Sequence, residues 1–207
     1  MNYKMTFSEL KDKFYQSMYS ELFAFSKTNN NKDIYSLVFD CESNISQICL
    51  RYGNEAHYAK LSKDFEKYAD LYNGKRNGLH GQKYSVGEFA FIESAEYNGY
   101  VFLQFDEQTE HFLKSCYYHN IGEYYSEGDP IEQLDSGEVL NKTTVKELFC
   151  EMIIDCIERL KQNIGFLNVT QDFIFYMCDS TYSSLENEEL MKKTVDSDIL
   201  DKLNNIA

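Results

Sequence analysis

The sequence predicts a single α+β domain over residues 1–207, built on one mixed or antiparallel sheet that is covered by helices. Three observations lead to this fold class. Apolar residues recur three or four positions apart between 145 and 160, which is the spacing of a helix that lays one face on a sheet. Residues 173–178 are apolar without a break, as in a strand covered on both faces. Residues 34–52 have the pattern of a β-hairpin.

The N-terminal part is expected to hold one helix and this hairpin. Apolar residues at helical spacing predict a helix from Ser8 to about Ser26. Residues 34–39 are mostly apolar, whereas residues 45–52 alternate, so the second strand is expected to have one wet face. Pairing the strands around a turn at 42–44 places residue 49 opposite residue 37. Cys41 and Cys49 are then out of register for a disulfide, which favours reduced thiols.

The middle of the chain mixes helix and loop signals. After the break at Gly53-Asn54 we expect a helix with these inward residues: Leu61, Phe65, Tyr68, Ala69 and Tyr72. Ser85 and Glu88 have the spacing of a capping box, which predicts a short helix through Phe89 and Phe91. Residues 100–116 fit a strand or a helix, and we interpret their three-four spacing as a helix.

The C-terminal third is predicted in more detail. Thr144 and Glu147 have capping-box spacing for a helix that runs to 160, and Gly165 is placed to take a left-handed cap. The buried strand at 173–178 stops at Asp179. One or two short amphipathic helices follow, and they include Ile199, Leu200 and Leu203.

Composition narrows the classes of function. The formal net charge is −14, which argues against nucleic acid or an anionic membrane as a partner, since both need a basic footprint. No apolar run approaches the roughly 18 residues that span a bilayer, and the N-terminus lacks the apolar core of a signal peptide, so we expect a cytoplasmic protein. The acidic excess is compatible with solubility alone, and it is also what a binder of a basic protein would show.

Four stretches of the chain resemble one bacterial family. They are the hairpin from Asp33–Phe39 to Gly53-Asn54-Glu55, the segment Tyr84–Phe89, the helix Glu147–Leu160 with Ile164-Gly165-Phe166, and the strand Phe173–Asp179. The family is catalogued as a domain of unknown function, number four-three-zero-three. The chain departs from its pattern at Gly53-Asn54, where Asn-Thr is expected, and at Tyr84 and Phe89, where tryptophans are expected. The resemblance implies architecture and the setting of toxin–immunity clusters, and no mechanism.

Metal-ligand residue types gather only at His111, Cys116 and His119. On a helix, His111 is offset from Cys116, and no Cys-x-x-Cys or His-x-x-x-His pair supplies the remaining zinc ligands. We therefore predict neither a metal nor a cofactor, and favour an apolar thiol with surface histidines.

A catalytic set is equally hard to find. His57 and His80 lie in polar stretches, and no nucleophile elbow precedes any serine or cysteine, so no catalytic residue is predicted. Asp179 ends the buried strand, where catalytic residues often lie in open sheets, but capping of the next turn is the favoured interpretation. Carboxylate pairs such as Glu107 with Glu110, or Glu188 with Glu189, are interpreted as solvated surface.

The most acidic stretch runs from Asp106 to Glu138, with nine acidic residues and one lysine, Lys114. Tyrosines stand among these carboxylates. Rings supply contact area at an interface, and the charges steer a basic partner. Packing of the same rings onto the core is the alternative. The predicted partner-binding residues are Asp106, Glu107, Glu110, Tyr117, Tyr118, Glu123, Tyr124, Tyr125, Glu127 and Asp129.

The sequence thus predicts a cytoplasmic acidic binding protein of the immunity type, which inhibits a basic bacterial toxin by occluding its surface. One alternative is a carboxylate-dependent hydrolase with a pocket between sheet and loop. Another is a regulatory interaction module. A closed cleft with two convergent acids would favour the hydrolase, whereas an open acidic face would favour the binding protein.

Overall fold

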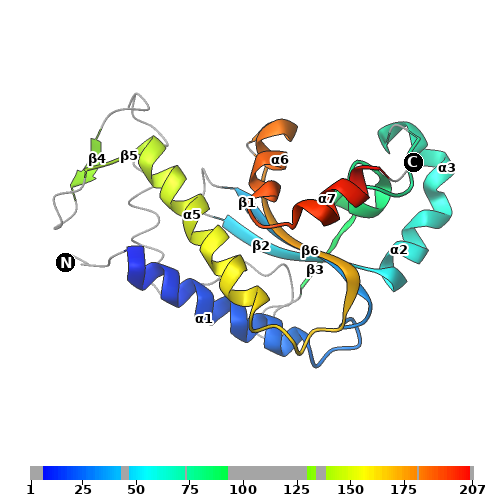
Figure 1. Ribbon diagram of the computed structural model, residues 1–207, viewed down its shortest axis with the longest axis horizontal. Helices are drawn as coiled ribbons and strands as arrows, with labels where there is room; N and C mark the ends of the chain where they lie inside the picture. The colour runs from blue at the N-terminus through cyan, green and yellow to red at the C-terminus, as the bar shows by residue number, and fades with distance from the viewer. Residues whose placement is uncertain are drawn as a thin grey trace.

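The computed structural model describes residues 7–42, 47–72, 74–92, 130–133, 139–180 and 182–205. The fold centres on a four-stranded sheet with the strand order β3–β2–β1–β6 (Figure 1). The strands are β1 (Ile34–Glu42), β2 (Gln47–Asn54), β3 (Ala90–Phe91) and β6 (Val169–Asp179). β2 runs antiparallel to β1 and β3, and β6 runs parallel to β1. The predicted α+β class with a mixed sheet is confirmed.

One face of the sheet is covered by two long helices, α1 (Phe7–Phe25) and α5 (Lys142–Lys161), which lie side by side in Figure 1. Both carry an apolar stripe, so both can bury one face against the strands. Met18 of α1 and Ile153 of α5 are fully buried in this core together with Phe39 of β1. The predicted helix from Ser8 to about Ser26 is confirmed.

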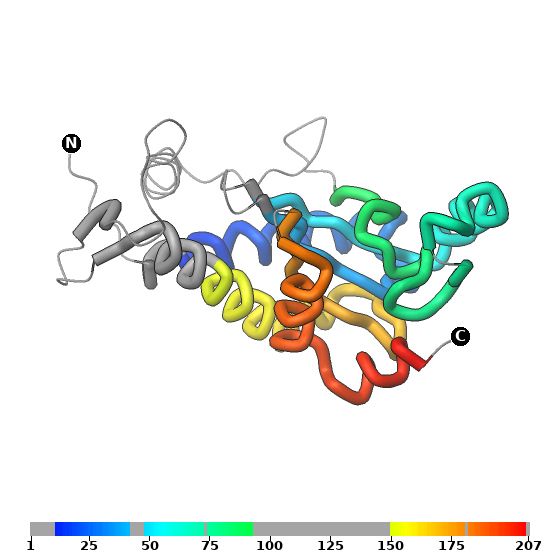
Figure 2. Tube along the Cα trace, turned by 90° about the horizontal axis from the view of Figure 1, so that it is seen from above, coloured from blue at the N-terminus to red at the C-terminus, as the bar shows by residue number. Residues whose placement is uncertain are grey.

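The other face is covered by shorter pieces of chain. They begin with α2 (Glu55–Leu61) and α3 (Phe65–Tyr68), and end with α7 (Ser197–Asn204). α6 (Ser184–Lys192) packs against β6 and contributes Leu190 to the core under α1 and α5 and Met191 to the core on the other face. The segment 55–89 and α7 meet at the same end of the molecule, where the amide of Leu79 donates to the carbonyl of Leu203 (Figure 2). Tyr35 and Tyr176 of the sheet are buried beneath them.

Alternating side chains explain why residues 173–178 of β6 are all apolar. Phe175 and Met177 belong to the core under α1 and α5, whereas Ile174 and Tyr176 belong to the core on the other face. A strand that is covered on both faces has no position for a solvated residue. The predicted strand at 173–178 is confirmed, and it is longer than predicted at its N-terminal end.

The predicted hairpin is present, but its predicted register is wrong. Cys49 lies opposite Asp40 rather than residue 37, and Cys41 lies opposite Ile48. The register differs because Glu42 pairs with Gln47 in the ladder, whereas the prediction placed residue 42 in the turn. β2 also continues through Gly53 to Asn54, the two residues interpreted as a break. Asn54 ends the strand and also caps α2, since its side-chain Oδ1 accepts a hydrogen bond from the amide of His57 at 2.8 Å.

The single helix predicted through residues 61–72 is also wrong. Two short α-helices alternate there with 3₁₀ turns at Ser62–Asp64 and Ala69–Tyr72. Each 3₁₀ turn advances the chain by a different angle per residue, so one face cannot stay inward. Phe65 and Tyr72 are buried as expected, but Tyr68 is 42% exposed.

The capping box predicted at Ser85 and Glu88 does not form. A 3₁₀ turn, Val86–Glu88, replaces the short helix, and the Ser85 side chain makes no capping hydrogen bond. The chain then pairs as β3 with the edge of β2. The guanidinium of Arg51 on β2 lies 4.0 Å from the ring centroid of Phe91, which adds a cation–π contact to that pairing.

The start and end of α5 differ from prediction for local reasons. A two-stranded sheet, β4 (Pro130–Gln133) with β5 (Val139–Asn141), leads directly into Lys142, so Thr144 and Glu147 lie inside the helix and cannot be its cap. Gly165 does not take the predicted left-handed conformation; Gly74 and Gly78 do, among the described glycines. The predicted amphipathic tail is confirmed, with Leu200 and Leu203 buried. Within the described residues, no helix is long and apolar enough to cross a bilayer.

Candidate functional site

The predicted partner-binding surface lies outside the described residues. This holds for Asp106, Glu107, Glu110, Tyr117, Tyr118, Glu123, Tyr124, Tyr125, Glu127 and Asp129. It also holds for His111, Cys116 and His119, and for the helix predicted at 100–116. These interpretations stay predictions, and the site described below comes from other parts of the chain.

A groove of about 530 Å³ lies between α5 and α6. We call it the acidic groove, because its wall carries three carboxylates and one ammonium group. Its lining residues are Cys150, Glu151, Tyr182, Leu185, Glu186, Glu189, Leu190 and Lys193.

Local structure fixes the α6 wall of this groove. The Ser183 hydroxyl accepts a hydrogen bond from the amide of Glu186 at 3.3 Å, and the Glu186 carboxylate accepts one from the amide of Ser183 at 2.7 Å. This is a complete capping box, which fixes where α6 begins. Leu185 lies two residues after the cap, in the first turn of α6, and is 75% exposed. The Ser-x-x-Glu spacing is visible in the sequence and could have located this helix start.

The floor of the acidic groove is a tyrosine beside a thiol. The Tyr182 hydroxyl lies 3.5 Å from the Sγ of Cys150. Burial raises the pKa of Tyr182, and the contact with Cys150 and the nearby Asp179 raise it further. Tyr182 therefore stays protonated at neutral pH and can act as a neutral hydrogen-bonding group.

Asp179 lies behind this floor and is fully buried. Its backbone is held by Asn187 of α6, which accepts a hydrogen bond from the Asp179 amide at 2.7 Å and donates one to the Asp179 carbonyl at 3.0 Å. The chain then turns, with the amide of Tyr182 donating to the same carbonyl at 3.1 Å. In the structure, the turn is thus held by the backbone of Asp179 and the side chain of Asn187.

Charge on the groove wall is only partly neutralised. Lys192 pairs with Glu189 at 2.8 Å and with Glu188 at 3.3 Å, and these contacts raise the pKa of Lys192. Exposed pairs of this kind contribute little to stability and are screened by salt. Glu151, on the α5 side, is exposed. The groove therefore presents negative charge around an apolar centre formed by Leu185 and Leu190.

A second cluster of polar side chains lies on three neighbouring strands, near the C-terminal ends of β1 and β6. Asp40 lies between Cys49 on β2 and Cys178 on β6. Its carboxylate accepts hydrogen bonds from the Nε of Arg51 at 2.5 Å and from the Sγ of Cys178 at 3.6 Å. Cys49 and Cys178 are two strand spacings apart, roughly 10 Å, so they cannot form a disulfide with each other.

This second group is poorly suited to nucleophilic catalysis. Burial raises the pKa of Cys178, and the neighbouring Asp40 raises it further. A thiol reacts as its thiolate, so a raised pKa makes it inert at neutral pH. Both described histidines lie elsewhere: the Nε2 of His57 is 3.0 Å from the carbonyl of Glu88, and His80 is exposed. In the part of the chain that the structure describes, no three ligand-type side chains converge as a metal site.

A scan against protein-family models, a search of curated proteins and a search of solved structures each found no match to this chain. The resemblance to the family of unknown function therefore stays a prediction, and the site must be interpreted from its own geometry.

Proposed function

We propose that this protein is a cytoplasmic binding protein that captures a basic protein and that the acidic groove forms part of its contact surface. The carrying observation is the groove itself, where carboxylates surround an exposed leucine and a half-buried tyrosine floor. Interfaces typically combine an apolar, aromatic centre with a polar rim. The partner class that we propose is a toxin, which the protein would inhibit by occlusion.

Charge supports a basic partner in two ways. The formal net charge of −14 acts over several ångströms and attracts cationic proteins before contact. At contact, the carboxylates of Glu151 and Glu189 are exposed and can pair with arginine or lysine side chains. Long-range attraction of this kind raises association rates by roughly 10- to 1,000-fold and weakens as salt increases.

The size of the groove limits its share of the interface. A volume of about 530 Å³ accepts one or two side chains, whereas a stable protein interface buries roughly 800 Å² on each partner. Further contacts are required, and we propose that the stretch from Asp106 to Glu138 supplies them. Reversing Glu123, Glu127 and Asp129 to lysine should slow association; an unchanged association rate would exclude that stretch as a contact surface.

The test compares two charge-matched variants with the parent protein. The products of neighbouring open reading frames serve as candidate partners, and association is followed at low and at physiological salt. Glu151→Lys with Glu189→Lys changes the groove, whereas Asp64→Lys with Asp70→Lys changes exposed acids near α3. Both variants shift the formal charge from −14 to −10, because each replacement adds two charges.

We expect the groove variant to associate about tenfold more slowly than the control variant at low salt. Growth inhibition by the partner should be relieved by the parent protein and less so by the groove variant. Equal association by both variants would show that net charge alone acts, and the acidic groove would then be excluded as a contact surface. Glu186 is left unchanged because its carboxylate completes the cap of α6.

A hydrolase is the second candidate, and the burial of Asp179 behind Tyr182 is the observation that favours it. A buried carboxylate beside a groove is a common arrangement for acid–base chemistry. Asp179→Asn should abolish hydrolysis of a responsive substrate if this candidate is correct. Binding without any turnover, in the parent protein and in the variant, would exclude it.

A further inference from the structure

The side chain of Lys83 lies among three tyrosine rings. Its ammonium nitrogen is 4.7 Å from the ring centroid of Tyr35, 5.7 Å from that of Tyr58 and 5.9 Å from that of Tyr84. The Glu55 carboxylate lies 2.6 Å from the same nitrogen. Aromatic faces attract cations within about 6 Å of the ring centroid. We call the three rings the tyrosine cage, and its occupant in the structure is a cation.

The rings of the tyrosine cage form walls rather than a flat stack. The ring of Tyr35 is inclined by 82° to that of Tyr58 and by 62° to that of Tyr84. Tyr35 and Tyr84 are 1% and 4% exposed, whereas Tyr58 is half-buried. The side chains of Lys83 and Glu55 are 16% and 45% exposed. The cage therefore has a buried floor and reaches solvent beside Tyr58 and Glu55.

Contacts that do not involve the Lys83 side chain hold these rings. The ring of Tyr35 packs on the backbone of Gly53, where an added Cβ atom would lie 2.5 Å from it. The Tyr58 hydroxyl donates a hydrogen bond to the carbonyl of Arg76 at 3.0 Å, and the backbone amide of Lys83 donates to the same carbonyl at 3.0 Å. The cage is thus preformed, which lowers the ordering cost of binding a ligand.

Negative charge reaches the buried floor of the tyrosine cage from two carboxylates. Burial raises the pKa of Tyr35, and Glu55 raises it further. Burial also raises the pKa of Tyr84, with further contributions from Asp172 and Glu55. Both rings therefore stay neutral phenols at neutral pH, and the nearby carboxylates add to their attraction for a cation.

The cage is wider than a primary ammonium group requires. The Lys83 nitrogen lies close to the ring of Tyr35, whereas the centroids of Tyr58 and Tyr84 are near the outer limit of a cation–π contact. By comparison, the Lys27 nitrogen lies 4.4 Å from the ring centroid of Phe23. An N-methyl carbon is about 1.5 Å from its nitrogen. Methyl groups on an ammonium at this place would therefore extend toward the two more distant rings.

We propose that the tyrosine cage binds a quaternary ammonium group and that Lys83 occupies the cage until such a ligand displaces it. Choline-type compounds and trimethylated lysine side chains carry this chemistry. Displacement breaks the Lys83–Glu55 pair, which is partly exposed and so contributes little to stability. Lys83 acts as an internal competitor, because a ligand binds only those molecules in which Lys83 has left the cage.

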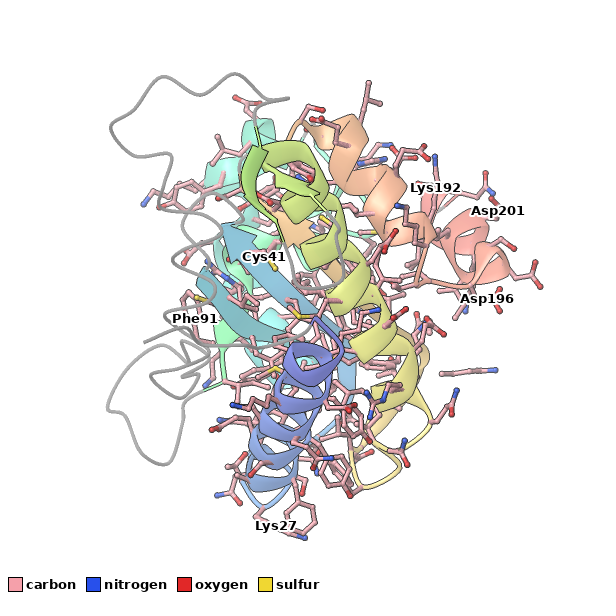
Figure 3. All side chains as sticks on the ribbon, turned by 90° about the vertical axis from the view of Figure 1, so that its left-hand side faces the viewer. Lys27, Cys41, Phe91, Lys192, Asp196 and Asp201 are labelled. Atoms are coloured by element: carbon pink, nitrogen blue, oxygen red, sulfur yellow. The ribbon has the colours of Figure 1, made fainter. Side chains whose placement is uncertain are left out.

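The tyrosine cage stands apart from the acidic groove. Tyr58 and Tyr84 belong to the segment that leads from α2 to β3, whereas the acidic groove lies between α5 and α6. Figure 3 shows Phe91 of β3 and Lys192 of α6 on opposite sides of the molecule. A quaternary ammonium group also has no N–H to donate to a carboxylate. The two proposals can therefore fail independently.

The probe is choline, and its matched control is 3,3-dimethylbutan-1-ol, which has the same shape without the charge. Lys83→Ala opens the tyrosine cage, whereas Lys67→Ala removes a lysine that lies 4.9 Å from the single ring of Tyr68. NMR titration follows the choline methyl protons, which shift upfield over aromatic rings. We expect Lys83→Ala to bind choline at millimolar concentration, and the parent and Lys67→Ala to bind it about tenfold more weakly.

The neutral control should bind Lys83→Ala at least about tenfold more weakly than choline does. Equal binding of the two compounds, or no binding of choline to folded Lys83→Ala, would overturn the proposal. Tyr58→Leu in the Lys83→Ala background removes one wall at a half-buried position and should weaken choline binding about fivefold. Unchanged binding in that double variant would also overturn it, because the ligand would then lie elsewhere.

The parent protein decides the question if Lys83→Ala does not fold. Bound choline must displace Lys83, so the side-chain NMR signals of Lys83 should lose their ring-current shift in step with choline binding. No displacement at about 0.1 M choline would overturn the proposal. The variant Glu151→Lys with Glu189→Lys should bind choline as the parent does, which separates this test from that of the proposed function.

A trimethyllysine peptide distinguishes the two sources of the ligand. Its control is the same peptide with unmodified lysine, which should bind Lys83→Ala at least about tenfold more weakly. Tighter binding of the trimethyllysine peptide than of choline would assign the cage to a modified protein, and the reverse order would assign it to a small molecule. Equal binding of the modified and unmodified peptides would overturn the requirement for a quaternary ammonium group.

Discussion

The two faces of the sheet are built from different kinds of chain and different kinds of side chain. Under α1 and α5, long helices lay aliphatic and phenylalanine side chains on the strands. On the other face, which we call the tyrosine face, short helices and 3₁₀ turns surround Tyr35, Tyr84 and Tyr176. A regular helix repeats its apolar positions, so its buried face is visible in the sequence. Apart from α7, the tyrosine face has no such repeat, and the contacts of its tyrosines depend on the rest of the fold.

Of the replacements that we propose, Phe39→Ala is expected to lower the free energy of unfolding most, because it removes a ring from the core under α1 and α5. Phe39 is fully buried, and its ring lies 5.5 Å from that of Phe14 and 5.2 Å from that of Phe175. Loss of a buried phenylalanine costs about 3 to 5 kcal/mol of the free energy of unfolding. Urea denaturation measures it. Leu71→Ala, at a largely exposed site, should change it by less than about 0.5 kcal/mol. A cost near 1 kcal/mol for Phe39→Ala would contradict a close-packed core on this face.

Gly53→Ala tests the tyrosine face at its tightest contact. A Cβ atom on Gly53 would lie 2.5 Å from the Cζ of Tyr35, well inside contact distance. We expect a loss of about 1 to 3 kcal/mol, because the ring must move within a packed core. A second replacement, Tyr35→Leu, removes the clashing ring atoms, so Gly53→Ala should cost less in that background. Equal costs in the two backgrounds would show that the ring and Gly53 are not in contact.

The difference between the two faces also explains what could be predicted from sequence. The helix at 8–26 and the tail at 199–203 were predicted because apolar residues recur at helical spacing, and the strand at 173–178 because its residues are apolar without a break. The helix at 61–72 was wrong because 3₁₀ turns interrupt its period. The hairpin register was wrong because Glu42 pairs with Gln47 instead of lying in the turn. Gly53 was interpreted as a break, but it stays in β2, where the ring of Tyr35 leaves no room for a Cβ atom.

The acidic groove shows the same limit. Glu186 and Glu189 are visible in the sequence as acidic residues, and the Ser183 cap has a recognisable spacing. That these two residues lie near Glu151 of α5 is not visible in the sequence. It depends on the packing of α6 against the end of β6, and β6 lies between the two helices in the chain. The acidic groove is therefore a product of tertiary structure, and a chemical motif could not have located it.

Alkaline pH should destabilise the tyrosine face through Tyr72. The pKa of Tyr72 is raised to about 12, mainly by burial and next by the hydrogen bond that its hydroxyl donates to Glu88. A tyrosine in the unfolded chain ionises near pH 10. Its contribution to stability is therefore complete below about pH 10 and is lost as the pH rises toward about 12. Denaturation at several pH values measures this loss. Tyr72→Phe should flatten the decline in that window, and an unchanged decline would assign it to other groups.

Tyr84→Phe should change the free energy of unfolding least. The sign of this change distinguishes Tyr84 from Tyr72. Tyr84 is 4% exposed, and no described residue forms a hydrogen bond with its hydroxyl. A buried hydroxyl without a protein partner contributes no hydrogen bond, so its removal should change the free energy of unfolding by less than about 1 kcal/mol and can increase it. Tyr72→Phe loses the bond to Glu88 and should cost about 1 to 2 kcal/mol. If Tyr84→Phe costs as much as Tyr72→Phe, the hydroxyl of Tyr84 has a hydrogen-bond partner. The buried polar atoms of the tyrosine face would then be as fully hydrogen-bonded as those under α1 and α5.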